Sequence, residues 1–267
     1  MDKHNSETWK INVVIKAASI LKYFTGKKPQ WTLTQLVQET KMPKSTLSNM
    51  LKTLEYCDIL EKDESNQFYR LGMEILEMSY GARMGLPIIE YAMHFLDEIQ
   101  QKTGEIVYFT VPRHGKVLYL DASYPANKNV LYSITGKTLN MHCTGVGKAM
   151  LSKLSEHEIK QIIDYHGMER FTPTTITNFE DLMKEIKQIR ECGYAIDRSE
   201  EAHGVKCVAV PIVNGDRVLG AISISGSIIS IKDEMILDYA QMLISVANIL
   251  AQKPEMFPNC PMLPKIE

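Results

Sequence analysis

The sequence of 267 residues predicts an α+β protein of two domains. Residues 31–71 combine two short amphipathic helical patterns with a hairpin pattern, which is the order of a winged helix-turn-helix. After residue 105, strand patterns cluster in the middle with helical patterns on both sides, which predicts a mainly antiparallel sheet. We therefore expect a winged helix-turn-helix at 1–71, a connecting helix at 72–86, a second domain at 87–253 and a C-terminal tail at 254–267.

The N-terminal domain is predicted to begin with a helix over about residues 12–24. Thr32, followed three positions later by Gln35, matches a capping box and predicts that the next helix starts near Leu33. Pro43 suits the first turn of the following helix, where its missing N–H is not needed. Together these signals predict a pair of short helices between Trp31 and Tyr56.

The second helix of this pair has two different faces. Its apolar side chains are Leu47, Met50, Leu51 and Leu54. Its outward face has small polar and basic side chains: Lys44, Ser45, Thr46, Ser48, Asn49 and Lys52. Ser, Thr and Lys suit phosphate contacts, and an Asn side chain can bond adenine bidentately. Taken alone, the helix is equally compatible with an ordinary amphipathic helix whose polar face is solvated.

A hairpin over residues 59–62 and 67–71 follows this helix directly and would form a wing. Lys62 and Arg70 would be its charged members, and Arg70 is a candidate contact to the DNA backbone. Residues 1–72 hold 11 Lys and Arg against 8 Asp and Glu, whereas the rest of the chain is net acidic. A basic head on an acidic body agrees with a DNA-binding domain joined to a sensor.

The composition and motifs argue against several other classes of protein. No apolar run reaches the ~18–20 residues of a membrane span, and no signal-peptide pattern is present. The five cysteines include no CxxC pair, so a reduced, cytoplasmic protein is expected. No HExxH, GxSxG or phosphate-loop motif occurs, and neither an enzyme nor a cofactor is predicted.

The second domain is predicted from alternating strand and helix patterns. Helical patterns cover residues 72–84, 88–102, 145–154, 156–165, 179–192 and 233–251. Strand patterns cover residues 106–111, 116–120, 130–134, 207–213 and 217–225, with an Asn214-Gly215 turn between the last two. Antiparallel sheets with helices on one face often hold a small ligand on the other.

Several motifs resemble the IclR family of bacterial transcriptional regulators, from about Val13 to Ala251. They are PKSTLSNMLKTLE at 43–55, HCTGVGKAML at 142–151, and GYAIDRSEEAHGVKCVAVPI with GAISISG between 193 and 226. The resemblance implies a GAF-like effector domain, a dimer or dimer of dimers, and a palindromic operator. It leaves open whether the regulator is a repressor or an activator.

The resemblance also implies an effector pocket. Its positions in this chain are Leu131, Leu139, Gly145, Val146, Asp197, Val205, Cys207, Ser223 and Ser225. Backbone N–H groups at the start of the helix after His142 could meet a carboxylate, so a small organic acid is the expected effector. The alternative is that the serines satisfy local hydrogen bonds and Cys207 packs as a small apolar residue.

Two positions depart from the family pattern. Asn49 stands where the family often has Arg, so the base read there would differ. Asp58 stands where Gly commonly ends the recognition helix, and Asp tolerates a left-handed backbone better than most residues.

The sequence is also compatible with two functions other than effector sensing. His142, Cys143, Asp197, His203 and Cys207 could converge as a nucleophile pair or a metal site. Ordinary polar packing of the histidines is the leading alternative to that idea, and no metal is predicted. A DNA-binding protein with no effector remains a third possibility.

Overall fold

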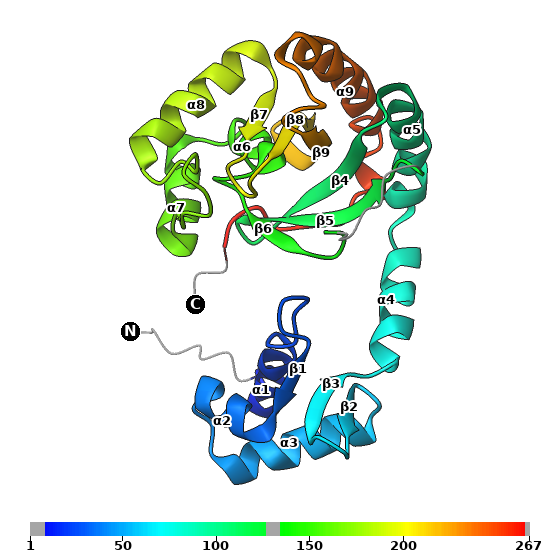
Figure 1. The fold of residues 1–267 in the computed structure, drawn as a ribbon, viewed down its shortest axis with the longest axis vertical. Helices are drawn as coiled ribbons and strands as arrows, with labels where there is room; N and C mark the ends of the chain where they lie inside the picture. The colour runs from blue at the N-terminus through cyan, green and yellow to red at the C-terminus, as the bar shows by residue number, and fades with distance from the viewer. Residues whose placement is uncertain (1–8, 127–133, 265–267) are drawn as a thin grey trace. The chain divides into compact units, whose positions relative to one another are not determined.

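The computed structural model describes residues 9–126 and 134–264 (Figure 1). The chain forms two compact units, Met1–Gly85 and Leu86–Glu267. Each unit has its own hydrophobic core. They are therefore described separately.

The first unit is a winged helix-turn-helix, as predicted. Its elements are α1 (Asn12–Leu21), β1 (Gln30–Thr32), α2 (Leu33–Thr40), α3 (Lys44–Tyr56), β2 (Leu60–Asp63), β3 (Phe68–Leu71) and α4 (Glu74–Met84). The strands form an antiparallel sheet in the order β1-β3-β2. The sequence did not predict β1, because its three residues are too few to show an alternating pattern.

The predicted helix boundaries of this unit have clear local causes. Thr32 and Gln35 form the reciprocal capping box at the start of α2. Pro43 is the residue that precedes α3 and not its first helical residue, so the helix begins one position later than expected. Asp58, which follows α3, has φ 56°, the left-handed backbone that the sequence suggested.

The second unit contains a six-stranded antiparallel sheet in the order β6-β5-β4-β9-β8-β7. Its elements are α5 (Pro87–Thr103), β4 (Ile106–Arg113), β5 (Lys116–Ser123), β6 (Thr138–Asn140), α6 (Gly145–Leu151), α7 (Glu156–His166), α8 (Phe179–Cys192), β7 (Ala195–Arg198), β8 (Val205–Asn214), β9 (Arg217–Ser227), η1 (Asp233–Met235), α9 (Ile236–Leu250) and η2 (Pro254–Met256). Most of the strand predicted at 130–134 lies outside the described residues. The two short strands β6 and β7 were not predicted.

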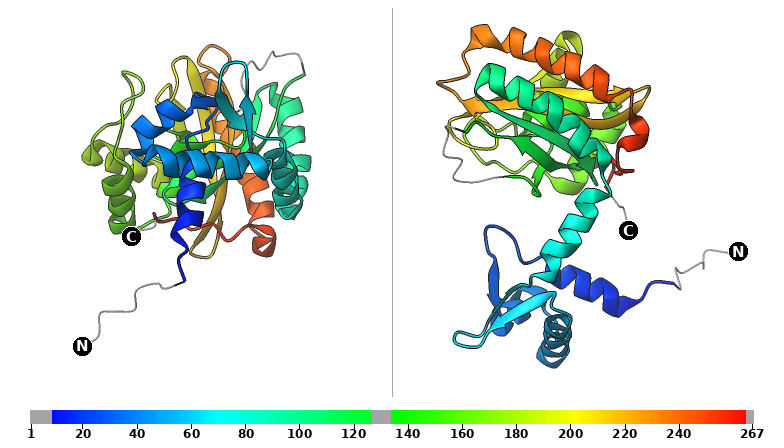
Figure 2. Two further views of the ribbon diagram at one scale, coloured as in Figure 1. Left: turned by 90° about the horizontal axis from the view of Figure 1, so that it is seen from below. Right: turned by 90° about the vertical axis from the view of Figure 1, so that its right-hand side faces the viewer.

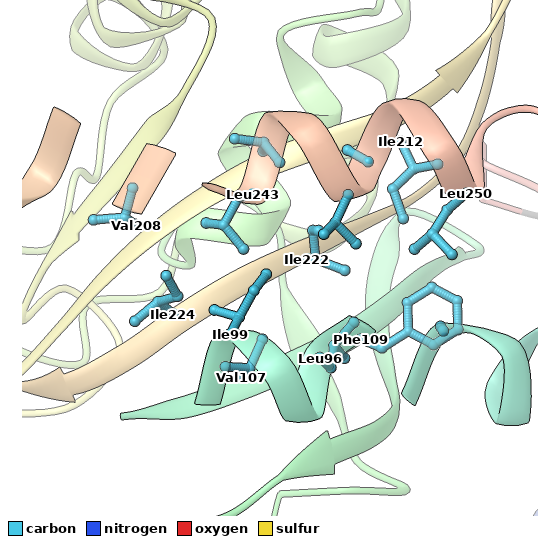
Figure 3. Close-up of a cluster of buried hydrophobic side chains, with 14 of the residues drawn as sticks. Leu96, Ile99, Val107, Phe109, Val208, Ile212, Ile222, Ile224, Leu243 and Leu250 are labelled. Atoms are coloured by element: carbon cyan, nitrogen blue, oxygen red, sulfur yellow. The ribbon is translucent and has the colours of Figure 1, made fainter. Parts of the chain in front are cut away.

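Helices cover both faces of this sheet (Figure 2). Side chains of α5 and α9 pack on one face, where Phe109, Ile222 and Leu243 lie within the larger core (Figure 3). Side chains of α6, α7 and α8 pack on the other face. In the described residues, neither face of the sheet is therefore free of helices.

The last residues of the unit are packed against it. Phe257 is buried, and its ring centroid lies 5.9 Å from that of Phe109. The main chain of the β4–β5 turn donates hydrogen bonds to the carbonyl groups of Pro261 and Met262. Within 9–126 and 134–264, no helix is long and apolar enough to cross a membrane.

Candidate DNA-recognition surface and effector site

The outward face of α3 presents the polar side chains that the sequence singled out. Leu47, Leu51 and Leu54 are buried and hold the helix on its unit. The opposite side chains are exposed or half-buried: Lys44, Ser45, Thr46, Ser48, Asn49 and Lys52. In the described part of the chain, neither lysine of this set belongs to an ion pair, so both charges are available to a phosphate backbone.

The wing differs from expectation in its charges. Arg70 donates two hydrogen bonds to the carboxylate of Glu61, from Nε at 3.1 Å and Nη2 at 2.7 Å. Lys62 Nζ lies 3.2 Å from Glu64 Oε1. The hydrogen bond from Arg70 lowers the pKa of Glu61, so this carboxylate stays ionised and keeps its partner. Both expected wing cations are therefore already paired with acids.

In the second unit, strand register brings four of the predicted effector positions together. Asp197 pairs with Cys207 across β7 and β8, and Cys207 pairs with Ser225 across β8 and β9. Ser223 lies two residues before Ser225, on the same face of β9. The Cys207 thiol donates a hydrogen bond to Ser225 Oγ at 3.0 Å. These polar groups form one row on the face beneath α6.

The start of α6 lies directly over this row. Thr144 precedes the helix and accepts a hydrogen bond from the Gly147 N–H at 3.2 Å. A Cβ at Gly145 would lie 3.3 Å from Ala209 Cβ and 3.6 Å from Asp197 Cβ. Glycine therefore allows the helix to approach β7 and β8 closely. Gly145 and its neighbour Val146 are both buried there.

The remaining predicted pocket positions are placed less closely. Leu139, on β6, is half-buried against the core beneath α6–α8, and Val205 is half-buried at the start of β8. Leu131 lies outside the described residues. The structure therefore brings together the polar members of the set more clearly than the apolar ones.

Tyrosines that the sequence reasoning missed lie on the same face. The ring centroids of Tyr108 and Tyr119 are 5.3 Å apart, edge to face, and Tyr124 lies 6.3 Å from Tyr108. Burial raises the pKa of Tyr108 and Tyr119, so both remain neutral phenols. Tyr108 and Tyr119 each stand between apolar residues in a predicted strand, and this placement was a signal that could have identified them.

Asp197 occupies the acidic end of the row. The side chain is buried, at 3 % exposed, and its Oδ1 accepts a hydrogen bond from the Glu200 N–H at 2.7 Å. Burial raises the pKa of Asp197 to about 7, although the Glu200 N–H opposes the shift. Near neutral pH, this carboxyl group is therefore a hydrogen-bond donor for much of the time.

The residues considered for a metal or a nucleophile do not form such a site. His142 Nε2 lies 3.1 Å from the Glu169 carbonyl oxygen, whereas His203 is exposed. Burial raises the pKa of Cys143 and Cys207 far above neutrality, so both are thiols and poor nucleophiles or metal ligands. Among the described residues, no three His, Cys, Asp or Glu side chains are grouped to hold a metal ion.

Comparison with known proteins identifies the family. The family model for the bacterial transcriptional regulator IclR C-terminal domain matches residues 82–251, which is more than half of the chain. The chain belongs to the IclR family. The IclR helix-turn-helix domain model matches residues 13–64. This regulator is 30% identical to the HTH-type transcriptional regulator XynR of Escherichia coli K12 over 87% of this chain and 93% of that protein.

Solved structures show the same fold. An IclR transcriptional regulator from Alicyclobacillus acidocaldarius superimposes with a TM-score of 0.80 at 24% identity, covering 91% of this chain and 98% of that one. An IclR homologue from Microbacterium hydrocarbonoxydans, complexed with 4-hydroxybenzoate, has a TM-score of 0.73 at 20% identity, covering 91% and 99%. The protein is a DNA-binding transcriptional regulator with an effector-binding C-terminal domain, and its relatives are named as regulators, not enzymes.

Proposed function

We propose that this regulator binds a small organic acid between α6 and the sheet, and that the bound acid controls operator binding by α3. One observation carries the proposal: the row of Asp197, Cys207, Ser225 and Ser223, whose carboxyl and hydroxyl groups are buried, lies within the domain that the IclR C-terminal model matches. Buried polar groups need hydrogen-bond partners, and a ligand can supply them.

The chemistry of the row favours an acid. Ser223 and Ser225 offer hydroxyl donors, and Asp197 in its acid form offers another. The tyrosine rings of Tyr108 and Tyr119 give the ligand an apolar wall. The Microbacterium relative was solved with 4-hydroxybenzoate, an organic acid.

The other predicted positions have supporting roles in this proposal. Gly145 and Val146 would offer backbone N–H groups to the acid as individual hydrogen-bond donors, since α6 has only seven residues. Leu139, Val205 and Leu131 would complete the apolar walls.

We further propose that α3 enters the major groove of a palindromic operator. Lys44 and Lys52 would neutralise phosphates, and Asn49 would read one base pair. The neighbouring hydroxyl groups of Ser45, Thr46 and Ser48 would contact the sugar-phosphate backbone. Arg70 would contribute less than these side chains, since its guanidinium group already donates two hydrogen bonds to Glu61.

We propose that the protein self-associates through α1, and the exposed apolar surface of the first unit supports this. Of the ten residues of α1, all of them described, Ile20 alone is buried. The side chains of Trp9 and Val14 are 76% and 60% exposed, with Ile11, Val13 and Ile15 exposed beside them. An apolar surface of this kind marks an interaction site, and a second copy would place two α3 helices on the half-sites of a palindrome. Val14→Glu should then give monomers in sedimentation velocity.

Control of DNA binding would be a shift between two arrangements of the paired DNA-binding units. Residues 72–86, which include α4, would be the connector that the effector biases. We place this switch in the bacterial cytoplasm, where operator DNA is found.

A ligand screen tests the proposal. Organic acids, including 4-hydroxybenzoate, are added to the purified protein and the shift in unfolding temperature is measured. Active compounds are then tested for their effect on binding to a duplex selected by the protein from random DNA. Asp197→Ala should abolish the response to the acid and leave DNA affinity without effector nearly unchanged.

The matched control is Asp164→Ala, because Asp164 is an exposed acid on α7. This variant should respond as the wild type does. Equal loss of DNA binding with and without the acid in Asp197→Ala would contradict the proposal. A flat response to every compound would favour a regulator without an effector.

A further inference from the structure

The wing carries much of the negative charge of an otherwise basic unit. Residues 1–72 hold eight Asp and Glu, and four of these fall between positions 58 and 64: Asp58, Glu61, Asp63 and Glu64. The same seven positions hold one basic residue, Lys62. DNA is a polyanion, so the wing has the opposite charge to the one that phosphate contacts require.

The wing is attached directly to the recognition helix. The Ile59 N–H donates a hydrogen bond to the Leu54 carbonyl oxygen of α3 at 3.0 Å, and the Gly72 N–H donates to the Ile59 carbonyl oxygen at 2.8 Å. Strand β2 also packs against α3 (Figure 1). Because the hairpin is short and bonded to α3, it accompanies this helix to the DNA. Charges on the wing are thereby brought near the phosphates that flank the groove.

Two of the wing acids occupy the two wing cations. Arg70 and Glu61 form a bidentate pair whose side chains are 52% and 51% exposed, so solvent and DNA can both reach it. Arg70 must break two charge-assisted hydrogen bonds before it can bind a phosphate. Lys62 is less accessible, at 19% exposed, and its hydrogen bond lowers the pKa of Glu64. Neither cation is therefore free to attract the DNA backbone.

The third wing acid, Asp63, is held by neutral donors. Its Oδ1 accepts hydrogen bonds from the Ser65 N–H at 2.9 Å and from the Ser65 hydroxyl at 2.6 Å. Its Oδ2 accepts a hydrogen bond from Asn66 Nδ2 at 2.7 Å. The Ser65 hydroxyl lowers the pKa of Asp63, so this carboxylate is ionised at neutral pH and adds a negative charge to the tip of the wing.

We propose that the wing acids Glu61, Asp63 and Glu64 restrain DNA binding. Glu61 withholds Arg70 from the phosphates, and the net negative charge of the wing repels them. The restraint acts on the backbone and reads no base, so it weakens binding to every sequence. Backbone attraction supplies essentially all of non-specific binding, and the wing therefore leaves the protein more dependent on its base contacts. The inference rests on the proposed placement of α3 in the major groove.

The two parts of the restraint differ in size. Removing one negative charge about a Debye length, ~10 Å at 0.1 M salt, from the nearest phosphates should strengthen binding by no more than about twofold. Releasing Arg70 adds one phosphate contact, which should steepen the slope of log affinity against log salt concentration by about 0.9. At 100 mM salt such a contact should strengthen binding by about fivefold.

Fluorescence anisotropy with the full chain, at 50 to 200 mM KCl, separates these effects. One duplex is selected by the protein from random DNA, and a second has an unrelated sequence. Glu61→Gln should bind both duplexes about fivefold more tightly at 100 mM KCl and steepen the slope by about 0.9. Asp63→Asn keeps an acceptor for Ser65 and releases no cation, so it should gain no more than about twofold.

Two further variants make the result specific. Adding Arg70→Ala to Glu61→Gln should reduce the gain to the twofold range of Asp63→Asn, because the released cation is then absent. Asp164→Asn is the matched control, because Asp164 pairs with the exposed Lys160 at 3.1 Å in the second unit. This variant makes the same change in net charge and also releases a cation, and it should bind DNA as the wild type does.

Three results overturn the proposal. They are an unchanged affinity and slope for Glu61→Gln, an equal gain for Asp164→Asn, and a gain confined to the selected duplex, which would mean base reading. Circular dichroism verifies that each variant is folded. If Glu61→Gln is not folded, the double variant of Asp63→Asn and Glu64→Gln takes its place, and an unchanged affinity there overturns the repulsion.

Lys52→Ala, measured in the same series, tests α3 separately. Its slope should be shallower by about 1 if α3 lies in the groove as proposed. If Lys52→Ala leaves the slope unchanged while Glu61→Gln steepens it, the restraint by the wing is supported and the proposed role of α3 fails. If Lys52→Ala makes the slope shallower and Glu61→Gln has no effect, the role of α3 is supported and the restraint fails.

Discussion

Replacing the buried Lys148 with methionine should destabilise the effector-binding unit by about 3 kcal/mol at pH 8. The lysine side chain is fully buried, and its Nζ is paired with Glu185 and Glu200. Methionine has a similar length, so the loss of volume is small, but it leaves the Glu200 carboxylate buried without a cation. Removing one partner of a buried pair costs roughly 3–5 kcal/mol. Glu185 retains 20% exposure, which places the expected loss at the lower end.

Two further variants test whether this loss of stability comes from the unpaired buried charge. Lys160→Met removes an exposed lysine 3.1 Å from Asp164 on the same helix, and a surface pair of this kind contributes about 0.3–0.5 kcal/mol. Adding Glu200→Gln to Lys148→Met removes the uncompensated carboxylate. The double variant should therefore recover part of the stability that Lys148→Met alone loses.

The assay is urea unfolding followed by circular dichroism, with tryptophan fluorescence recorded on the same samples. Both tryptophans, Trp9 and Trp31, belong to the first unit, so fluorescence follows that unit and circular dichroism follows both. A loss for Lys148→Met no larger than that for Lys160→Met would refute the reasoning. The same holds if Glu200→Gln simply adds a further loss to Lys148→Met.

Three other predictions concern packing, pH and DNA binding. Gly147→Ala should destabilise the protein by about 3 kcal/mol in urea unfolding, because the new Cβ would lie 2.4 Å from Met141 backbone atoms. Gly81→Ala is the control: no atom lies within 4 Å of its new Cβ, so this variant should stabilise α4 by about 0.5–1 kcal/mol. Burial lowers the pKa of His142, so the wild type should lose stability as the pH falls below about 6.5, the pKa of histidine in the unfolded chain. His142→Gln should weaken this pH dependence, which is measured by urea unfolding at several pH values. Lys52→Ala should reduce the slope of log DNA affinity against log salt concentration by about 1, as measured by fluorescence anisotropy. Arg70→Ala should change this slope little, because the Arg70 guanidinium group is paired with Glu61. Equal effects of the two variants would contradict our interpretation of the wing.

The wing contains one feature that the sequence predicts and one that it does not. The hairpin itself was predictable, since alternating residues and a polar turn are local signals. The pairing of Arg70 with Glu61 was not, because it depends on the register that places these two residues opposite each other across β2 and β3. The sequence therefore identified a basic residue in the wing, and the register showed that an acid already binds it.

The effector-binding unit also has elements that the sequence predicts and elements that it does not. Long helices and the Asn214-Gly215 hairpin were readable, whereas β6 and β7, with three and four residues, were too short to show a pattern. The placement of α6 over the sheet was also missed, because it depends on a close approach at Gly145 that no local pattern reveals. The burial of Lys148 could not be predicted, since nothing in the sequence distinguishes a buried lysine from an exposed one.

By itself, the sequence determined the winged helix-turn-helix, the antiparallel class of the second domain and the family resemblance, because capping, periodicity and motifs are properties of neighbouring residues. Only the tertiary structure decided that Asp197, Cys207 and Ser225 form one row beneath α6, and that Lys148 and Glu200 lie buried beside it. The physical reason is that strand register and burial set which charges lose water and which find partners. Those quantities depend on residues far apart in the chain.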